Sequence, residues 1–262
     1  MARLGTMAAA PPCTAGSPEP WGGALAPVVG SIWRLQCSLD AYSRSRGAGL
    51  ATQVSRGRHL QVLDSPLEAG SGPRLRVRLL DDGYPCWLSL LDLQAGAAPA
   101  GPPQLPRLDR RSIAARLDAV LAFAEAAAAV PNRYLWGGTL GPDFDCSGLV
   151  QTAYAALGIW LPRDAYLQER FCRPVAVRPG ETSLLEPGDL IFFGTPRRCT
   201  HVGLHLGGGR YLHSSGREHG RNGIGMDDLN PRNPDPVAAH YRAELRGAGR
   251  VMHSHDGSPL PG

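Results

Sequence analysis

The sequence contains no lysine, so all 27 of its basic residues are arginines, and its formal net charge is only +4. Nucleic-acid-binding domains gather their basic residues on one face or along one helix. The arginines here are dispersed along the chain, so we expect no nucleic-acid partner. The sequence also has no run of eighteen or more apolar residues, so we expect no membrane-spanning segment.

The six cysteines include no CxxC pair and no Cys/His cluster with zinc spacing, so we expect no metal and no cofactor. An even number of cysteines could form disulfides, but the chain is long enough to bury an adequate core without them. Residues 1–27 contain no continuous apolar segment typical of an export signal. We therefore expect mostly reduced, buried cysteines and a cytoplasmic protein, with a periplasmic location as the alternative.

Shifts in composition divide the 262 residues into parts. The segment RLRVRLL alternates apolar residues with arginine, which is typical of a half-buried strand, and the turn signal DDG follows it. Several short strands of this kind predict a small β-barrel. The expected parts are a disordered tail (1–27), the barrel (28–93), a Pro/Gly/Ala-rich linker (94–107), a larger domain (108–240) and a C-terminal tail (241–262).

The larger domain places helical patterns before strand patterns. Residues 110–130 and 146–158 carry helix formers with apolar residues at helical spacing. Short apolar runs follow at 189–194, 201–208 and 210–215. Helices followed by consecutive strands predict an α+β fold, because alternating α/β folds interleave the two.

The sequence DFDCSGLV brings Cys146 from a glycine-rich loop to the first turn of an apolar helix. The partial positive charge at a helix N-terminus stabilises a thiolate, which is the nucleophilic form of cysteine. Asp145 stands at the N-cap position, and Ser147 can offer its N–H or hydroxyl to a site. A single cysteine is more often structural, but this position favours a nucleophile that reacts with iodoacetamide even at mildly acidic pH.

A nucleophilic cysteine needs a base, and two histidines lie on the expected strands. His201 begins the strand THVGLHLGG, and His213 lies in the next one, RYLHSSG. A hairpin through residues 207–209 would place the two side by side, so that one could orient the other. The alternative is two ordinary half-buried histidines on adjacent strands.

These motifs together resemble a known family. FDCSGLV, PGDLIFF, THVGLHLG and YLHSSG, in this order within residues 110–230, resemble the NlpC-type papain-like endopeptidases of bacterial cell walls. LATQVSRGRHLQVL and DDGYPCWLSLLDL resemble a bacterial SH3-like domain. The combination is similar to cyanobacterial members that cut between γ-D-glutamate and a diamino acid. It implies a papain-like α+β domain preceded by an SH3-like barrel.

The resemblance also implies roles for individual residues. Cys146 is the expected nucleophile, His201 the base and His213 the group that orients the base. Asp164 corresponds to the residue that meets the free amine of an N-terminal L-Ala in the substrate. The other expected pocket residues are Tyr84 on the SH3 side, Tyr134, Trp136, Asp145 and Ser147. Core packing for the aromatic residues, hairpin packing for Tyr84 and a helix cap for Asp164 are the alternatives.

The implied activity is hydrolysis of the γ-D-glutamyl–meso-diaminopimelate bond in peptidoglycan peptides with a free N-terminal L-Ala, in cell-wall recycling. Two alternatives stay open: a papain-like amidase or acyltransferase, and a catalytically inactive domain attached to a cell-wall-binding module. The sequence leaves the oligomeric state open. It also assigns no role to two further histidines near the motifs, His205 and His219.

Overall fold

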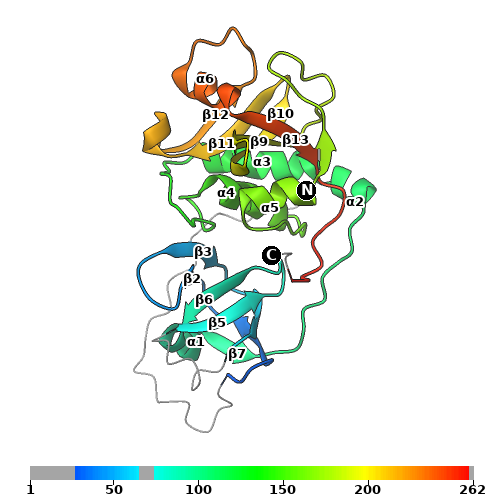
Figure 1. The fold of residues 1–262 in the computed structure, drawn as a ribbon. Helices are drawn as coiled ribbons and strands as arrows, with labels where there is room; N and C mark the ends of the chain where they lie inside the picture. The colour runs from blue at the N-terminus through cyan, green and yellow to red at the C-terminus, as the bar shows by residue number, and fades with distance from the viewer. Residues whose placement is uncertain (1–26, 65–73, 260–262) are drawn as a thin grey trace. The chain divides into compact units, whose positions relative to one another are not determined.

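The computed structural model describes residues 27–64 and 74–259. The chain divides into two compact units, which we describe separately (Figure 1). The N-terminal unit comprises residues 1–105 with 257–262, and the C-terminal unit comprises residues 106–256. The predicted tail at 1–27 lies, except for its last residue, outside the described residues.

The N-terminal unit is an antiparallel sheet with the strand order β3-β2-β6-β5-β4-β1-β7. In the predicted strand RLRVRL, now β5, Leu75, Val77 and Leu79 are buried and the arginines between them are more exposed. The alternation thus builds the core of the predicted SH3-like barrel. The elements are β1 (Ile32–Leu35), β2 (Leu39–Tyr42), β3 (Leu50–Val54), β4 (His59–Val62), β5 (Arg74–Leu79), β6 (Pro85–Ser89), α1 (Leu90–Gly96) and β7 (Ala97–Pro99).

A buried ion cluster fixes the turn between β5 and β6. The Arg58 guanidinium lies 3.1 Å from Asp81 and 2.8 Å from Asp82. Gly83 follows with φ +71°, a left-handed conformation that glycine adopts without strain. The Asp82 carboxylate accepts the N–H of Tyr84 at 3.2 Å, so the cluster also holds the backbone of Tyr84.

The linker prediction needs correction. The predicted linker at 94–107 begins inside regular structure, because α1 continues to Gly96 and β7 pairs with β1. Its Ala/Gly/Pro composition indicates flexibility, but three residues suffice to add a strand at the sheet edge, where proline is tolerated. Cys37 is disulfide-bonded, whereas the other described cysteines are free and buried as expected.

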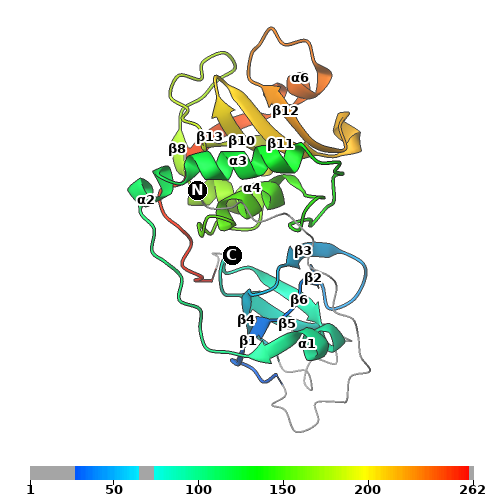
Figure 2. The same cartoon turned by 180° about the vertical axis from the view of Figure 1, so that it is seen from behind.

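The C-terminal unit is a six-stranded sheet with the strand order β12-β11-β10-β9-β13-β8. Helices α3, α4 and α5 cover one face and α6 covers the other (Figures 1 and 2). The elements are α2 (Arg110–Ala114), α3 (Leu117–Ala128), α4 (Cys146–Ala155), α5 (Ala165–Phe171), β8 (Arg173–Val175), β9 (Leu190–Thr195), β10 (Arg198–Gly207), β11 (Arg210–Ser215), the short 3-10 helix η1 (Arg217–His219), β12 (Gly223–Asp228), α6 (Pro236–Ala243) and β13 (Leu245–Arg250).

Strand β9 lies at the centre of this unit and is buried on both faces. Phe192 packs into the core beneath α3 and α4, and Ile191 and Phe193 pack into the core beneath α6. A strand covered on both sides needs a continuous apolar run, which explains the sequence LIFF. The prediction of an α+β domain behind a small barrel is therefore confirmed. No helix among the described residues is long and apolar enough to cross a membrane.

The predicted C-terminal tail at 241–262 is wrong for its first part. Helix α6 continues to Ala243, and β13 pairs with β9 on one side and β8 on the other. The sequence LRGAGR has too little apolar pattern to predict a strand. Close packing explains why residue 249 is a glycine, because a Cβ there would lie 2.5 Å from the Cβ of Cys172.

Candidate active site

Cys146 is the first residue of α4 and is only 6% exposed. The helix begins there because Asp145 has extended backbone and its carboxylate accepts the N–H of Gly148 at 2.6 Å. A Cβ on Gly148 would overlap the carbonyl oxygen of Gly138 in the preceding loop. The DCSG sequence therefore starts the helix and lets the glycine-rich loop pack against it, which fixes Cys146 at the positive helix end.

Asp145 and Ser147 belong to a buried ion-pair network on either side of Cys146. The guanidinium of Arg163, itself 1% exposed, donates to both Asp145 oxygens at 2.6 and 3.1 Å and to Ser147 Oγ at 2.9 Å. The N–H of Gly137 donates to Asp145 at 2.8 Å. The two predicted pocket residues thus lie beside the nucleophile, where their side chains hold the loop and the helix together.

His201 on β10 and His213 on β11 are joined by a hydrogen bond. The distance between His201 Nε2 and His213 Nδ1 is 2.7 Å, and both side chains are buried. The strands pair Leu204 with Leu212, so the histidines are diagonal neighbours on one face and not directly opposite. The predicted hairpin through residues 207–209 therefore brings them together.

Asp227 on β12 adds a third side chain to this hydrogen-bonded pair of histidines. The motifs in the sequence did not predict it. Its Oδ2 lies 2.6 Å from His213 Nε2, and the guanidinium of Arg221 lies 2.8 Å from both of its oxygens. A carboxylate can only accept, so His213 Nε2 carries the proton and His213 Nδ1 accepts from His201 Nε2–H. This assignment leaves Nδ1 of His201 as the free basic nitrogen.

Burial is the largest influence on the pKa values of His201, His213 and Asp227. It lowers the pKa of His201 well below the ordinary value, and electrostatic interaction with the neighbouring histidines His213, His219 and His240 lowers it further. Burial also lowers the pKa of His213 and outweighs the opposing effect of Asp227. Burial raises the pKa of Asp227, but its hydrogen bond to and electrostatic interaction with His213, together with Arg221, leave that pKa below the ordinary value. These shifts favour neutral imidazoles beside a charged carboxylate.

The Cys146 thiol lies close to the backbone beside His201. The backbone N–H of Val202, the residue that follows His201, is among the groups that act to lower the pKa of the thiol. Burial, and then the charge of Asp145, raise the pKa of Cys146 to about 12 against the opposing N–H groups and Arg163. Both shifts favour a neutral thiol and a neutral imidazole. They oppose the effect of the helix N-terminus, from which the sequence predicts a thiolate at mildly acidic pH.

This protonation state predicts the pH dependence of thiol alkylation. The thiolate is the reactive form, and the pKa of Cys146 is raised to about 12, so we expect its rate constant with iodoacetamide to rise about tenfold per pH unit between pH 5 and 9. Peptide mapping by mass spectrometry would follow each cysteine separately. A rate plateau extending down to about pH 5 would instead indicate a preformed thiolate–imidazolium pair.

Asp227→Asn tests the role of the missed carboxylate. An amide can donate to His213 Nε2 and so favour the opposite tautomer, which would disrupt the bond to His201. We expect peptide hydrolysis to slow by at least about tenfold through kcat. The matched control is Asp228→Asn, the next residue, whose carboxylate accepts from Asn230 and Asn233 instead. Equal rates for both variants would contradict the proposed role.

The remaining predicted residues have different surroundings. Tyr134 is half-buried, and its pKa is raised by burial and then by electrostatic interaction with Cys146 and Asp145, which places it in the surroundings of the nucleophile. Trp136 is 71% exposed and is therefore not a core residue. Asp164 precedes α5 and is half-buried, but its side chain makes no cap hydrogen bond. Tyr84 is partly buried against the core of the N-terminal unit, and its role in the site stays a prediction.

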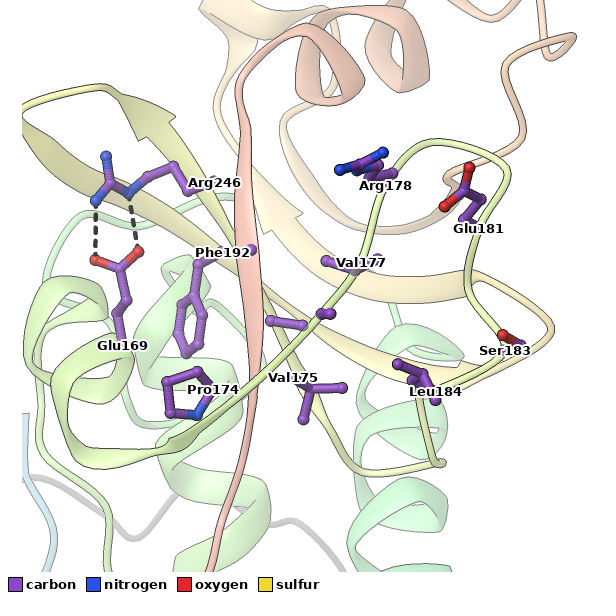
Figure 3. A pocket seen from close by; sticks show the side chains of 13 residues that line it. Glu169, Pro174, Val175, Val177, Arg178, Glu181, Ser183, Leu184, Phe192 and Arg246 are labelled. Atoms are coloured by element: carbon purple, nitrogen blue, oxygen red, sulfur yellow. Dashed lines mark hydrogen bonds and ion pairs between the residues drawn. The ribbon is translucent and has the colours of Figure 1, made fainter.

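A cavity of about 870 Å³ lies elsewhere in the C-terminal unit (Figure 3). It is lined by β13, β9 and the segment after β8, and the ion pair between Glu169 and Arg246 lies beside it. None of the three expected catalytic residues lines it. Among the residues that the structure describes, no group of three or more His, Cys, Asp or Glu could hold a metal ion.

Comparison with known proteins identifies both parts of the chain. Residues 131–237 match the NlpC/P60 family, and residues 42–93 match the bacterial dipeptidyl-peptidase Sh3 domain. The chain therefore contains an NlpC/P60 domain preceded by a bacterial SH3 domain, as the motifs predicted. The NlpC/P60 family is a family of cell-wall peptidases whose members are generally cysteine peptidases.

Two curated relatives are from Bacillus subtilis. The bifunctional muramidase/DL-endopeptidase CwlT is 35% identical over 123 residues, which are 45% of this chain and 32% of the relative. The gamma-D-glutamyl-L-lysine dipeptidyl-peptidase is 40% identical over 84 residues, which are 31% of this chain and 27% of the relative. The chain thus matches about a third or less of the length of either relative. A solved NlpC/P60 family protein from Bacillus cereus is 25% identical with a TM-score of 0.43, over 85% of this chain and 64% of that one.

Proposed function

We propose that this protein is a cysteine endopeptidase that hydrolyses the γ-D-glutamyl–diamino acid bond of peptidoglycan peptides, with meso-diaminopimelate as the diamino acid. The observation that carries the proposal is the hydrogen-bonded chain of His201, His213 and Asp227 beside a cysteine at a helix N-terminus. A nucleophile, a base and groups that orient the base are the parts that acyl transfer to sulfur requires.

The relatives support the same bond. One bears the name gamma-D-glutamyl-L-lysine dipeptidyl-peptidase, and the SH3 domain matched here is the dipeptidyl-peptidase type. That name gives lysine as the diamino acid, whereas the resemblance of the sequence favours meso-diaminopimelate. Both diamino acids carry an amine that the reaction releases, so the chemistry at Cys146 is the same for either.

The reaction begins with transfer of the thiol proton from Cys146 to Nδ1 of His201 as sulfur attacks the γ-glutamyl carbonyl carbon. The oxyanion receives stabilisation from the backbone N–H of Cys146 at the helix N-terminus. The C–N bond then breaks as His201 protonates the leaving amine, which leaves a thioester. Water, deprotonated by His201, attacks the thioester and restores the thiol with release of a free carboxylate.

Substrate selection forms the second part of the proposal. Asp164 meets the free amine of the N-terminal L-Ala, and Tyr84, Tyr134 and Trp136 contact the peptide. A requirement for a free amine would exclude intact, sugar-linked stem peptides, because their L-Ala nitrogen is acylated. This selectivity suits the recycling of released peptides, and we propose a cytoplasmic location for it, with the periplasm as the alternative.

The proposal is tested with the tripeptide L-Ala-γ-D-Glu-meso-diaminopimelate, the same peptide acetylated on the L-Ala nitrogen, and the lysine analogue. We expect cleavage of the free peptide to a dipeptide with a new carboxylate and free diaminopimelate, and much slower cleavage of the acetylated one. Equal cleavage of both peptides would support the peptidase activity and contradict the proposed amine site at Asp164. Transfer to an added amine without a new carboxylate would indicate an acyltransferase, and no reaction would favour the inactive binding module.

A further inference from the structure

Tyr241 on α6 touches both catalytic imidazoles. Its ring is stacked on His201 with centroids 4.3 Å apart and an interplanar angle of 23°, and it meets His213 edge-on at 4.8 Å and 88°. Tyr241 is 1% exposed, so water does not separate these rings. It lies beyond residue 237, where the match to the NlpC/P60 family ends.

The tyrosine is itself held at both ends. Its hydroxyl lies 2.7 Å from Ser215 Oγ, and its ring packs edge-on against Phe193 on β9. Helix α6 is capped by Asp235, whose carboxylate accepts the N–H groups of Val237 at 2.8 Å and Ala238 at 3.1 Å. The stacked ring is thus fixed by the core, by a hydroxyl anchor and by a capped helix.

His201 needs such support because its hydrogen bond to His213 holds the ring only at Nε2. One bond at one ring nitrogen leaves the imidazole free to swing about that contact, which would move Nδ1 away from the thiol. A ring stacked on its face blocks this swing. Misplacement of a reacting group by about 1 Å can cost about 100-fold in rate.

We propose that Tyr241 is a positioning residue that clamps the ring of His201 so that Nδ1 points at the Cys146 thiol. This inference rests on the proposed cysteine peptidase activity. It assigns a function to α6, a part of the chain that the family match does not include beyond its first residues.

Three variants separate positioning from packing. Tyr241→Phe keeps the ring and loses only the hydroxyl anchor, so we expect kcat within about threefold of wild type. Tyr241→Leu removes the ring, and we expect kcat to fall by about 10- to 100-fold with KM changed less than twofold. Val237→Ala, a buried residue of the same helix and the same core cluster, should lower the melting temperature and leave kcat unchanged. If Tyr241→Leu does not fold, Tyr241→Met takes its place.

A second readout does not depend on the substrate. In ¹⁵N NMR spectra of the histidine side chains, wild type and Tyr241→Phe should show His201 in a single tautomer with the proton on Nε2, and Tyr241→Leu should show exchange between tautomers. If the wild type does not cleave the peptide but Tyr241→Leu shows the tautomer exchange, the proposed function is rejected and the positioning role is retained. Unchanged kcat and tautomer in Tyr241→Leu, or an equal kcat loss in Val237→Ala, would overturn the positioning role.

Discussion

Replacement of His201 by glutamine is expected to lower kcat/KM for peptide hydrolysis by about 10²- to 10⁴-fold, the usual contribution of a general acid–base group. Glutamine can still donate to His213, but it has no nitrogen that accepts the thiol proton of Cys146. The pKa shifts favour a neutral resting pair, in which this proton moves during the attack, so the loss should fall on kcat. Steady-state kinetics at neutral pH would measure it.

His205→Gln is the matched control, because His205 is also buried and lies on the same strand. Its ring contacts the carbonyl oxygen of Glu186 and the N–H of Gly209, away from the three catalytic side chains. We expect it to change stability and to keep kcat/KM within a few-fold. A loss below about tenfold in His201→Gln would contradict the role of His201 as the base.

Arg163→Met is expected to have the largest effect on stability. It removes the guanidinium and leaves the Asp145 carboxylate buried at 7% exposure without its ionic partner. Breaking a buried pair from one side costs about 3–5 kcal/mol, which corresponds to a melting temperature lower by about 6–20 °C in a domain of this size. Denaturant unfolding of wild type and variant would measure the free-energy difference.

Two further variants show whether burial is the cause. Arg110→Met breaks the partly exposed pair with Glu186, and we expect a loss of less than about 1 kcal/mol. Adding Asp145→Asn to Arg163→Met removes the stranded charge, so the double variant should regain part of the lost stability. Similar losses for Arg163→Met and Arg110→Met would contradict the structural role of the buried pair.

Local sequence signals were sufficient to predict that Cys146 starts a helix and that His201 and His213 are neighbours, whereas the family resemblance joined the cysteine to the histidines. An N-cap residue before an apolar helix marks where the helix starts, and a glycine turn between two strands sets which residues come close. Both signals act over a few residues. The same reasoning predicted the barrel strand β5 from its period-two alternation.

The missed residues depend on long-range packing. Asp227 meets His213 only because β12 pairs with β11 in a register that the Asn/Pro/Arg-rich sequence around it does not indicate. Arginine is mostly found at the surface, and the burial of Arg163 is favourable only because it pairs with Asp145. Strand β13 lies between β9 and β8, where tertiary contacts replace the missing apolar pattern. Tyr241 precedes that strand and was missed for the same reason.

The most direct test of Cys146 as the nucleophile is hydrolysis of the free tripeptide by wild type, Cys146→Ala and Cys199→Ala. Cys199 is an equally buried free cysteine on the same strand as His201, so it controls for the loss of a thiol near the base. We predict cleavage by wild type and Cys199→Ala and a loss of at least about 10⁴-fold in Cys146→Ala. Cleavage by Cys146→Ala at the wild-type rate would contradict the thiol mechanism and the assignment of this site.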